Sequence, residues 1–398
     1  MTPKKMMVTV WWSRAGVIHH SFLPNGMSIA ADVYCEELIT IMGKLARLQP
    51  ALVNRSAPLL LHDNARPHTA QQTICKLQEL GNSTIKTDTA ETYQRISDYY
   101  AGKSVFLTGG TGFLGKVLIE RLLSTCTDID SIYVLIRGKR GMNAEQRQQQ
   151  ITDVPVRTAG HNCTYMYDNL FDKLKSLKPN TLKKIIAIEG DVTRPEPVVR
   201  TSDQQKLIDN VSVVIHSAAT VNFSDTFRDT MTVNYEGTKK LVHLAKKIKN
   251  LETFVYISTA FANSDKMIVD EVMYPRLRTE EEVDSFIDVF GDDEQAVEKF
   301  LCGSPNKYTL SKALCENYLQ ENRGSMKTII IRPSIVTPTL GDPLPGWCDS
   351  WVAATALFSD VARGLTRAVH GHRGVVCDLV PADLVCHLAI VAAARGNR

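Results

Sequence analysis

From Tyr99 onward, short apolar runs alternate with stretches in which apolar residues recur at helical spacing. The runs are almost uninterrupted, as expected for parallel strands that are covered on both faces. Helical stretches between consecutive strands favour a doubly wound α/β domain with a parallel sheet. Six strands are predicted: Lys103–Thr108, Ser131–Arg137, Lys184–Glu189, Val211–His216, Thr253–Thr259 and Lys327–Arg332.

The residues up to Gly81 carry an α/β pattern of their own. Between Gly81 and Tyr99 lies a polar joint rich in Thr, Asp and Lys, which we interpret as a linker. We therefore expect a first part at 1–81, a linker at 82–98 and a second domain at 99–398. The first part is predicted to contain the strands Met6–Trp12, Gly16–Leu23 and Pro58–His62 and the helices Ala31–Leu48 and Thr69–Leu80.

A glycine-rich turn joins the first predicted strand of the second domain to a helix. The helix is indicated by Leu114, Leu118 and Leu122, which are spaced four residues apart. Glycines in such a turn let the backbone approach a pyrophosphate and place that anion at a helix N-terminus. Because a strand and a helix flank the turn, we predict a dinucleotide site of the Rossmann type. The residues expected to hold the cofactor are Thr108, Gly109, Thr111, Gly112, Phe113, Leu114 and Gly115.

The residues after the second strand indicate which dinucleotide binds. Arg137, followed by Lys139 and Arg140, stands where an NAD enzyme usually carries an acidic residue. A basic side chain there suits the 2′-phosphate of NADP, so we predict NADPH as the cofactor. A solvated basic turn is the alternative interpretation.

Two further strand ends offer candidate cofactor contacts. Asp191, which precedes Val192, follows the third strand at a position that often contacts adenine in such folds, although a simple turn aspartate would give the same pattern. Ala218 lies among small residues after the fourth strand. These residues would let the backbone approach the nicotinamide half of the cofactor, or they serve close packing alone.

Tyr308 and Lys312 lie four residues apart in a stretch with helical spacing, Tyr308–Leu319, and therefore share one helix face. The ammonium should favour the phenolate and lower the tyrosine pKa towards neutrality, which would make Tyr308 a usable general acid or base. Ser258 and Thr259 end the fifth strand, where a hydroxyl can donate to a substrate oxygen. Such a pair can arise by chance, but the glycine turn, the hydroxyl and Tyr-x-x-x-Lys in this order predict a dehydrogenase or reductase site.

Composition narrows the class of protein only a little. The chain has 398 residues and a formal net charge of +3, which argues neither for nor against binding to nucleic acid or to an anionic membrane. Its nine cysteines form no C-x-x-C pair, so we expect reduced thiols in an intracellular protein. The N-terminus lacks the apolar core of a signal peptide, and no apolar run reaches the length of a membrane span.

Longer motifs carry a resemblance to a known family. They are Ile331–Val336, Asp342–Trp347 and Asp378–Val385. With the glycine turn and the Tyr-x-x-x-Lys motif, they make residues 99–394 similar to the NAD(P)-binding domain of alcohol-forming fatty acyl-CoA reductases, which belong to the extended short-chain dehydrogenase/reductase superfamily. The superfamily motifs alone would also fit a sugar epimerase or a steroid dehydrogenase. The Pro-Gly-Trp and Leu-Val-Pro runs favour the acyl-CoA reductases.

The resemblance implies a substrate and a role for each site residue. A long-chain fatty acyl-CoA would be reduced by NADPH, through a hemithioacetal and an aldehyde, to a fatty alcohol. Tyr308 would protonate the developing alkoxide, and Lys312 would tune it and orient the ribose. Thr259 would hold the oxygen, with Ser258 as the fallback, and Asn234 would order the active-site helix or a proton-relay water. The superfamily pattern also implies cofactor contacts from Val192, Ala218, Lys312 and Pro333.

The chain departs from the family pattern in two places. Residues 153–167 do not resemble the family's helix and connection, whereas the acidic insert at 270–304 is also present in family members as a substrate lid. Family members continue beyond the position of Arg398 into a helical C-terminal domain, often with a membrane anchor, and are typically found at peroxisomal or endoplasmic reticulum membranes. We therefore expect the chain to lack this domain, to carry no membrane span of its own and to have an incomplete acyl pocket.

The first part resembles a different family. Val8–Trp12, Gly16–Ile18 and above all His62–Thr69 are similar to the catalytic domain of mariner-type transposases, which implies a partial RNase H-like α/β fragment. Asp63 would be the second of three metal-binding carboxylates. Because two-metal cleavage needs all three, we expect neither a metal site nor strand transfer here. We also expect no specific nucleic-acid binding, since no helix-turn-helix domain precedes the fragment.

Three functions therefore stay open for the whole chain. The first is an NADPH-dependent fatty acyl-CoA reductase. The second is another reductase on the same scaffold, acting on a sugar nucleotide or a sterol. The third is an inactive fusion product of a transposase and a reductase.

Overall fold

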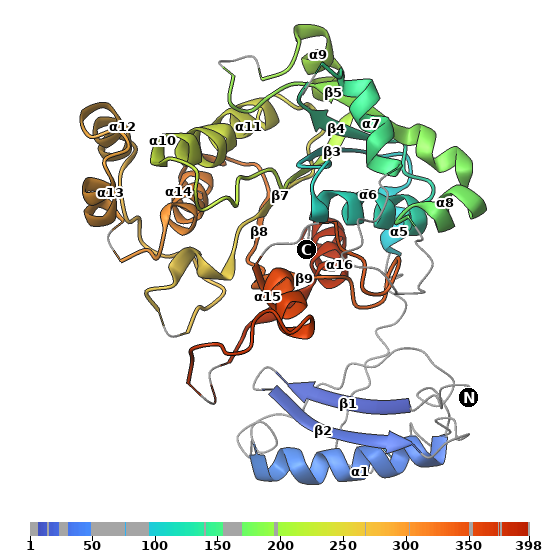
Figure 1. Cartoon of the computed structure of the whole chain (residues 1–398). Helices are drawn as coiled ribbons and strands as arrows, with labels where there is room; N and C mark the ends of the chain where they lie inside the picture. Colours follow the sequence, from blue (N-terminus) through green and yellow to red (C-terminus); the bar gives the residue numbers. More distant parts are fainter. Residues whose placement is uncertain are drawn as a thin grey trace. The chain divides into compact units, whose positions relative to one another are not determined.

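The computed structural model divides the chain into two compact units, Met1–Tyr93 and Gln94–Arg398, and each is described here by itself (Figure 1). The residues that the structure describes are 7–13, 16–23, 31–48, 76, 95–138, 141–153, 169–194, 198–266, 268–301, 303–349, 353–372, 374 and 376–396.

The first unit contains a β-hairpin and one long helix. Strands β1 (Met7–Ser13) and β2 (Gly16–Leu23) pair in antiparallel fashion, and α1 (Ala31–Leu48) contacts β2. The buried face of α1 carries Tyr34, Leu38 and Ile41 at helical spacing. These three elements agree with the sequence prediction. The predicted strand Pro58–His62 and the aspartate at position 63 fall outside the described residues. Of the predicted helix Thr69–Leu80, the structure describes residue 76 alone.

The second unit is built on a parallel sheet of six strands in the order β5-β4-β3-β6-β7-β8. Each predicted strand is confirmed to within one or two residues at its ends. The strands are β3 (Ser104–Thr108), β4 (Ser131–Ile136), β5 (Ile185–Glu189), β6 (Val211–His216), β7 (Thr253–Ile257) and β8 (Thr328–Ile331).

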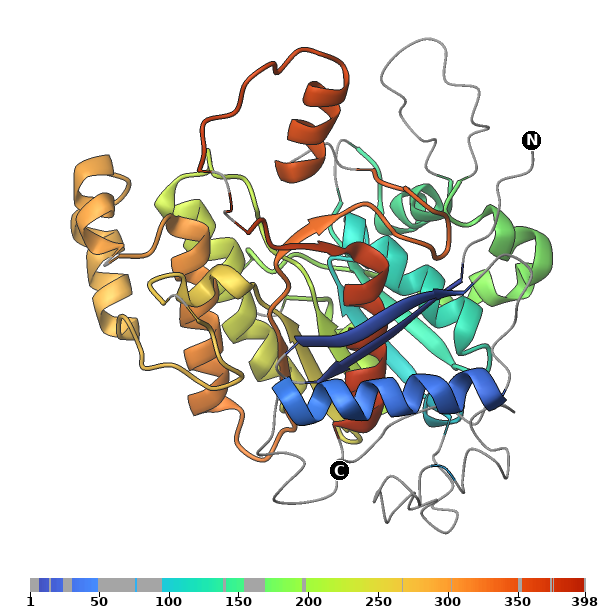
Figure 2. The same cartoon turned by 90° about the horizontal axis from the view of Figure 1, so that it is seen from below.

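Helices cover both faces of this sheet (Figures 1 and 2). Because side chains alternate along a strand, Val105 and Leu107 of β3 join the core on one face while Phe106 joins the core on the other. The first face is covered by α5 (Ile96–Tyr100), α6 (Phe113–Thr125), α7 (Ala144–Thr152), α8 (Asp172–Leu177) and α16 (Ala382–Arg395). The second face is covered by α9 (Thr201–Asn210), α11 (Gly237–Ala245) and α14 (Lys307–Asn322).

Shorter elements complete the second unit. They are the 3₁₀ turns η1 (Pro179–Lys184) and η3 (Ala260–Asn263), the π-helical turn η2 (Met231–Glu236), the helices α10 (Phe227–Thr230), α12 (Glu280–Val289), α13 (Glu294–Phe300) and α15 (Ala353–Ala362), and the strands β9 (Ile335–Thr337) and β10 (Leu379–Pro381). None of the helices in the described part of the chain is long and apolar enough to cross a membrane.

The strand order reverses at β3, where β4 pairs on one side and β6 on the other. Thr108 and His216, which end these two central strands, lie opposite each other in the register. In an open parallel sheet, ligands bind in the crevice at this switch point, beyond the carboxyl ends of the strands. The glycine turn predicted to hold a dinucleotide follows Thr108 directly, so it lies at this edge.

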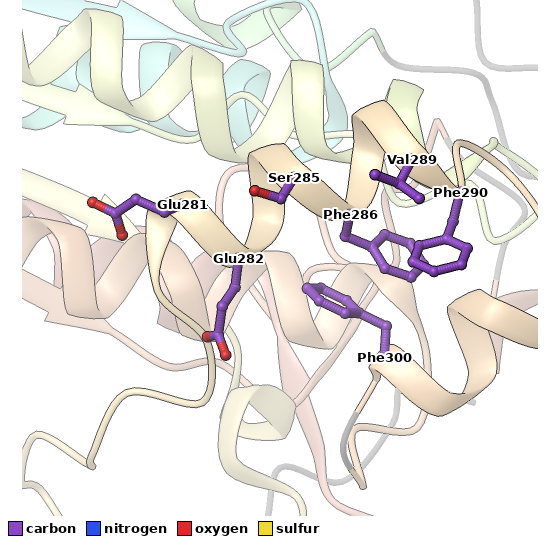
Figure 3. Close-up of a pocket in the computed structure, with 7 residues that line it drawn as sticks. All are labelled: Glu281, Glu282, Ser285, Phe286, Val289, Phe290 and Phe300. Atoms are coloured by element: carbon purple, nitrogen blue, oxygen red, sulfur yellow. The ribbon is translucent and has the colours of Figure 1, made fainter.

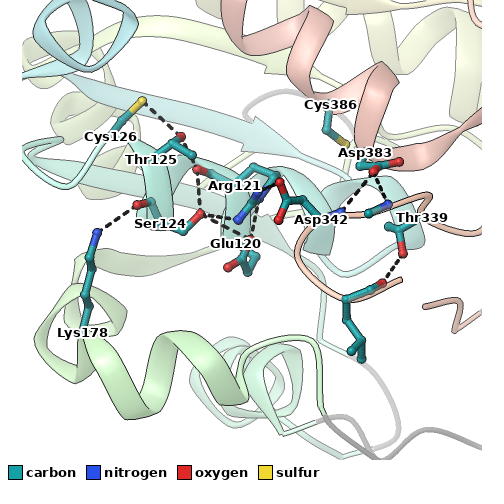
Figure 4. Close-up of polar contacts among 12 residues, drawn as sticks. Glu120, Arg121, Ser124, Thr125, Cys126, Lys178, Thr339, Asp342, Asp383 and Cys386 are labelled. Carbon is teal, nitrogen blue, oxygen red and sulfur yellow. Dashed lines mark hydrogen bonds and ion pairs between the residues drawn. The ribbon is translucent and has the colours of Figure 1, made fainter. Parts of the chain in front are cut away.

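Two motifs singled out in the sequence meet near the start of α16. Strands β9 and β10 pair in parallel, which brings the runs around Pro333 and Pro381 together. The Asp383 carboxylate accepts hydrogen bonds from three consecutive backbone amides, at Leu340, Gly341 and Asp342 (Figure 4). These bonds lower the pKa of Asp383 despite the opposing effect of burial. Asp342 in turn pairs with Arg121 of α6, with 3.1 Å between Nη1 and Oδ2, so the loop is fixed to two helices.

Candidate active site

The glycine turn is closed by backbone packing that leaves no room for side chains. Gly109 has a φ of +76°, and a Cβ there would lie 2.8 Å from the backbone nitrogen of Ala218. A Cβ at Gly115 would overlap the carbonyl oxygen of Gly109. The predicted residue Ala218 is thus brought against the turn, and its N–H donates to Thr108 Oγ1 at 3.2 Å.

Helix α6 begins at Phe113, with Gly112 as its N-cap and no side chain capping it. The first N–H groups of a helix lack intrahelical partners, so this end suits a phosphate. Thr111 and Leu114, on either side, are half-buried. An open helix start beside a turn of close-packed backbone fits the pyrophosphate of a dinucleotide.

The Pro-Gly-Trp run lies against the start of α6. The Trp347 ring stacks on that of Phe113 with 5.5 Å between centroids. Lys116, one turn into the helix, pairs with Asp349 at 2.5 Å. The sequence singled out Trp347 as family-specific, but only the structure shows that it borders the glycine turn.

The basic residue predicted to select NADP is Arg137, which is exposed just after the end of β4. The Arg147 side chain of α7 donates from Nη1 to the carbonyl oxygen of Arg137. Burial, and then the charge of Arg137, lowers the pKa of Arg147. Two guanidinium groups therefore lie near each other at this strand end. Lys139 and Arg140 lie outside the described residues.

Asp191 and Val192 follow β5. The Asp191 carboxylate accepts from both the N–H and the hydroxyl of Thr193, each at 2.9 Å, which is the geometry of a turn-forming aspartate. Val192 is buried, and a Cβ on Gly237 would lie 3.0 Å from its side chain. A contact between Asp191 and adenine stays a prediction.

Helix α14 carries the predicted tyrosine and lysine. Lys312 is buried, and its ammonium donates to the carbonyl oxygen of Ile257, the last residue of β7, at 2.7 Å. The same Nζ lies 4.7 Å from the ring centroid of Tyr256 and 5.9 Å from that of Tyr308. The structure therefore brings Tyr308 and Lys312 together at the carboxyl edge of the sheet.

The expected lowering of the tyrosine pKa is not found. Burial, followed by the neighbouring Cys315, raises the pKa of Tyr308 to about 12. Burial also lowers the pKa of Lys312 to about 8. The predicted lowering of the Tyr308 pKa was wrong. It considered the charge of Lys312 but not the loss of solvation on burial, which disfavours the phenolate.

The two strand-end hydroxyls point to different partners. Ser258 Oγ donates to the buried Glu316 carboxylate at 2.5 Å. Thr259 Oγ1 accepts from the N–H of Phe261 at 3.3 Å and donates to the carbonyl oxygen of Pro333 at 3.4 Å. Both hydroxyls donate within the protein, but the Ser258 bond to a carboxylate is short and the Thr259 bond to a carbonyl is long. Which of the two donates to a substrate oxygen stays a prediction.

Glu316 was missed in the sequence, although it stands four residues after Lys312. It pairs with Arg332 through a two-pronged contact, with Nε 3.0 Å from Oε1 and Nη2 2.8 Å from Oε2. Arg332 also donates to the carbonyl oxygens of Asp270 and Val272, at 3.0 and 2.9 Å. The pair thus ties α14 and β8 to the beginning of the insert.

Asn234 lies in the π-helical turn η2, a kind of irregularity that is frequent at functional sites. Its Oδ1 accepts from the N–H of Thr220 at 2.8 Å, and its Nδ2 donates to Ser311 Oγ at 2.9 Å. Asn234 therefore links the loop after β6 to the helix that carries Tyr308.

The insert between the strand-end hydroxyls and Tyr308 forms helices α12 and α13. Phe286 and Phe300 stack with 4.1 Å between ring centroids. A shallow hollow of about 470 Å³ lies between the two helices (Figure 3). It is lined by Glu281, Glu282, Ser285, Phe286, Val289, Phe290 and Phe300. Whether this insert acts as a substrate lid stays a prediction.

Comparison with known families supports both resemblances. The family described as male sterility protein, an NAD-binding domain, matches residues 107–389. A second family, described as transposase (partial DDE domain), matches residues 1–55, a match that ends before Asp63.

Individual proteins agree with the first family. Fatty acyl-CoA reductase 1 from Gallus gallus is 37% identical over 300 residues, which cover 75% of this chain and 56% of that protein. The human protein of the same name is 35% identical with the same coverage. The chain thus spans about half the length of the curated relatives it matches.

Among solved structures, the reductase (R) domain of a nonribosomal peptide synthetase from Mycobacterium tuberculosis has a TM-score of 0.51. It is 21% identical, and the match covers 74% of this chain and 63% of that one, which supports the fold. The fold, the glycine turn and the family match together indicate a nicotinamide cofactor. Over residues 107–389 the chain belongs to the male sterility protein family of NAD-binding reductases, within the extended short-chain dehydrogenase/reductase superfamily.

Proposed function

We propose that the chain reduces a long-chain fatty acyl-CoA to a fatty alcohol with NADPH. One observation carries the proposal: Lys312 is held by the carbonyl of Ile257 at the carboxyl edge of the sheet, with Tyr308 one helix turn away. This is the edge at which the glycine turn begins. The substrate class is supported by the similarity to fatty acyl-CoA reductases over 75% of this chain.

In this proposal, one residue of the site binds the substrate oxygen and another gives it a proton. When bound, the reduced nicotinamide would supply hydride to the thioester carbon. Thr259 would donate a hydrogen bond to the carbonyl oxygen, on which charge develops. Tyr308 would then give its proton to that oxygen, because an alkoxide is a stronger base than a phenolate. The resulting hemithioacetal would break down to the aldehyde and the free thiol of coenzyme A, with the hydroxyl proton passing to the thiolate. The aldehyde would then be reduced to the alcohol by a second NADPH, again with a proton from Tyr308.

Lys312 would stabilise the phenolate left on Tyr308. With a pKa of about 8, its amine is mostly protonated at neutral pH. The ammonium has a single backbone carbonyl as its hydrogen-bond acceptor among the described residues, so two of its three protons remain for a ribose hydroxyl.

The preference for NADPH is supported by Arg137 and Arg147. The two guanidinium groups repel each other, and an anion between them would relieve the repulsion. Glu189, which ends the adjacent strand β5, is paired with Arg200 and therefore does not present a free carboxylate to the ribose. The 2′-phosphate of NADPH fits this strand end better than an unmodified ribose.

We also propose that the transposase-like part, residues 1–81, takes no part in the reduction. The boundary between the two compact units, at Tyr93 and Gln94, falls inside the proposed linker 82–98. In this proposal the reductase domain begins at about Tyr99, and Tyr99 and Tyr100 are both buried in its core.

The full chain, incubated with NADPH and a panel of acyl-CoAs of different length, tests this function. Fatty alcohol should form and should be lost in Tyr308→Phe. Tyr318→Phe is the matched control, because Tyr318 lies on the same helix and bonds to His243 instead of the site. NADPH binding without turnover of any acyl-CoA would contradict the proposal, as would full activity in Tyr308→Phe.

A further inference from the structure

A buried histidine lies between the glycine turn and the active-site helix. His216, the last residue of β6, is 1% exposed. Its Nδ1 lies 2.7 Å from Thr108 Oγ1, and its Nε2 lies 2.9 Å from Thr238 Oγ1 of α11. Burial, with a smaller contribution from the charge of Lys312, lowers the pKa of His216 to about 3. The imidazole is therefore neutral, with one donor and one acceptor nitrogen.

The hydrogen bonds around the ring decide which nitrogen carries the proton. Thr238 Oγ1 donates to the carbonyl oxygen of Asn234 at 2.6 Å, so it can only accept from the imidazole. Nε2 of His216 must then be protonated and Nδ1 bare. Thr108 therefore donates its hydroxyl proton to Nδ1, and its oxygen accepts the N–H of Ala218. Every polar atom in this group has a partner of the correct kind.

The connection continues from Asn234 to the active-site helix. Asn234 Nδ2 donates to Ser311 Oγ at 2.9 Å, and Ser311 Oγ donates to the carbonyl oxygen of Tyr308 at 2.7 Å. A path of buried polar groups, which passes through the backbone carbonyl and the side-chain amide of Asn234, thus runs from the first residue of the glycine turn to the helical turn that bears Tyr308. We call Thr108, His216, Thr238, Asn234 and Ser311 the polar path.

We propose that His216 is a positioning residue that fixes the glycine turn relative to the Tyr308 helix through this polar path. The inference rests on the proposed function, because it assumes that the cofactor lies between the two elements. A neutral ring with one defined tautomer can connect a donor on one side to an acceptor on the other. No water can replace a lost partner of polar atoms that are so deeply buried. Removing one hydrogen bond therefore leaves the next group on the path unsatisfied and alters its position.

An ordinary core histidine, satisfied by two threonines, would produce the same local contacts. The two interpretations differ in how far along the chain of hydrogen bonds a substitution changes the structure. A local histidine would affect its immediate neighbours alone, whereas the polar path couples Thr108 to Ser311 across the site. Substitutions at these two ends should then be non-additive, while distant independent sites usually add to within about 0.5 kcal/mol, roughly a factor of two.

The decisive experiment is a double-mutant cycle with Thr108→Val and Ser311→Ala in the full chain. The readout is the Kd for NADPH, measured by fluorescence titration without acyl-CoA. We expect the double variant to deviate at least fivefold from the product of the single effects. Thr253→Val with Ser311→Ala is the matched control cycle, because Thr253 is an equally buried threonine that bonds to Ala393 outside the path. The control should be multiplicative to within twofold, and a multiplicative result in the first cycle would overturn the proposal.

Variants of the histidine give a second, independent test. His216→Gln keeps an amide that can donate to Thr238 and accept from Thr108, and it should keep NADPH affinity to within about threefold. His216→Phe removes the acceptor of the Thr108 hydroxyl proton and the imidazole donor to Thr238, and it should weaken NADPH binding at least tenfold. If His216→Phe does not fold, nitrogen NMR of the wild-type ring decides. A neutral ring protonated at Nε2 at pH 5 is expected, and a charged ring or the other tautomer would overturn the proposal.

The two proposals fail in different ways. A chain that binds NADPH with the expected coupling but reduces no acyl-CoA would refute the substrate and leave the polar path standing. A chain that makes fatty alcohol but shows no coupling would refute the polar path alone.

Discussion

The carboxylate of Glu316 and the guanidinium of Arg332 form a two-pronged ion pair inside the second unit, with the Glu316 side chain 2% exposed and that of Arg332 14% exposed. The pair connects α14, one turn beyond Lys312, to the end of β8. It also holds Ser258 on one side and the carbonyls of Asp270 and Val272 on the other. Four segments that surround the proposed site are therefore joined through two side chains.

Breaking this pair should destabilise the fold. Glu316→Leu leaves the Arg332 guanidinium without its carboxylate and Ser258 without its acceptor. Removal of one partner from a buried ion pair typically costs about 3–5 kcal/mol. We expect a loss of about 3 kcal/mol in the free energy of unfolding, measured by urea denaturation.

Two further variants test whether the loss of stability comes from the unpaired buried charge. Lys206→Ala breaks the exposed pair with Asp203 and should change stability by less than about 1 kcal/mol. Glu316→Leu combined with Arg332→Leu removes both charges and should recover most of the loss, since replacing a whole buried pair by apolar residues is often neutral. If the double variant were less stable than the single one, the unpaired charge would not be the cause.

The glycine turn offers a test of close backbone approach. Gly109→Ala places a methyl group 2.8 Å from the backbone nitrogen of Ala218, at a φ of +76°. The turn must open to admit it, which disturbs the place proposed for the pyrophosphate. We expect the Kd for NADPH, measured by fluorescence titration, to rise at least tenfold.

Gly102→Ala is the control for Gly109→Ala. Gly102 has a similar φ of +69°, but nothing lies within 4 Å of the position that its Cβ would take. Both variants therefore carry the strain of a left-handed conformation, about 1–2 kcal/mol. Only Gly109→Ala meets the backbone of Ala218. Equal effects of the two variants on NADPH affinity would show that strain, and not the close approach, matters.

The choice between NADPH and NADH should depend on Arg137. A hydrogen bond to a charged group contributes about 1.5–3 kcal/mol, so Arg137→Ala should raise the KM for NADPH by at least about tenfold. The KM for NADH should change little, because NADH has no 2′-phosphate. Arg363→Ala, at an exposed arginine of the segment after α15, should alter neither value. A parallel loss with both cofactors in Arg137→Ala would speak against a 2′-phosphate contact.

Much of this arrangement could be predicted from the sequence, because local patterns determine it. The apolar runs gave the six strands, and the fifth run was overextended because Ser258 and Thr259 continue its spacing after β7 ends at Ile257. The sequence favours Thr259 over Ser258 as the donor to the substrate, and that preference stays a prediction. The bond from Ser258 to Glu316 could not be predicted, because Glu316 reaches Ser258 from a helix fifty-eight positions later in the chain. The contacts of His216 and Arg147 were missed for the same reason, since their partners come from other elements.

The ionisation of Lys312 gives the protein a pH dependence of known sign. Burial lowers the pKa of Lys312 from its usual 10.5 to about 8, so between these values the unfolded chain binds a proton that the folded chain has lost. Stability rises with pH wherever the unfolded state binds more protons. Lys312 should therefore contribute a gain in stability as the pH rises from 8 to 10, of about 2 kcal/mol if each pH unit contributes about 1.4 kcal/mol.

The comparison with Lys312→Met separates this effect from the rest of the protein, because the titrating groups that do not interact with Lys312 cancel in the difference. The free energies of unfolding of both proteins, measured in urea at pH 7, 8, 9 and 10, should show the wild type gaining on the variant only above pH 8. Tyr308 has the opposite sign: its pKa is raised from 10.0 to about 12, so it lowers stability only above pH 10. Burial raises the pKa of Cys315, and the Lys312 charge lowers it in part, so the window between pH 8 and 10 reports on the lysine together with this neighbouring thiol. A constant difference across that window would mean that the Lys312 ammonium is not destabilised by its burial beneath Tyr256 and Tyr308.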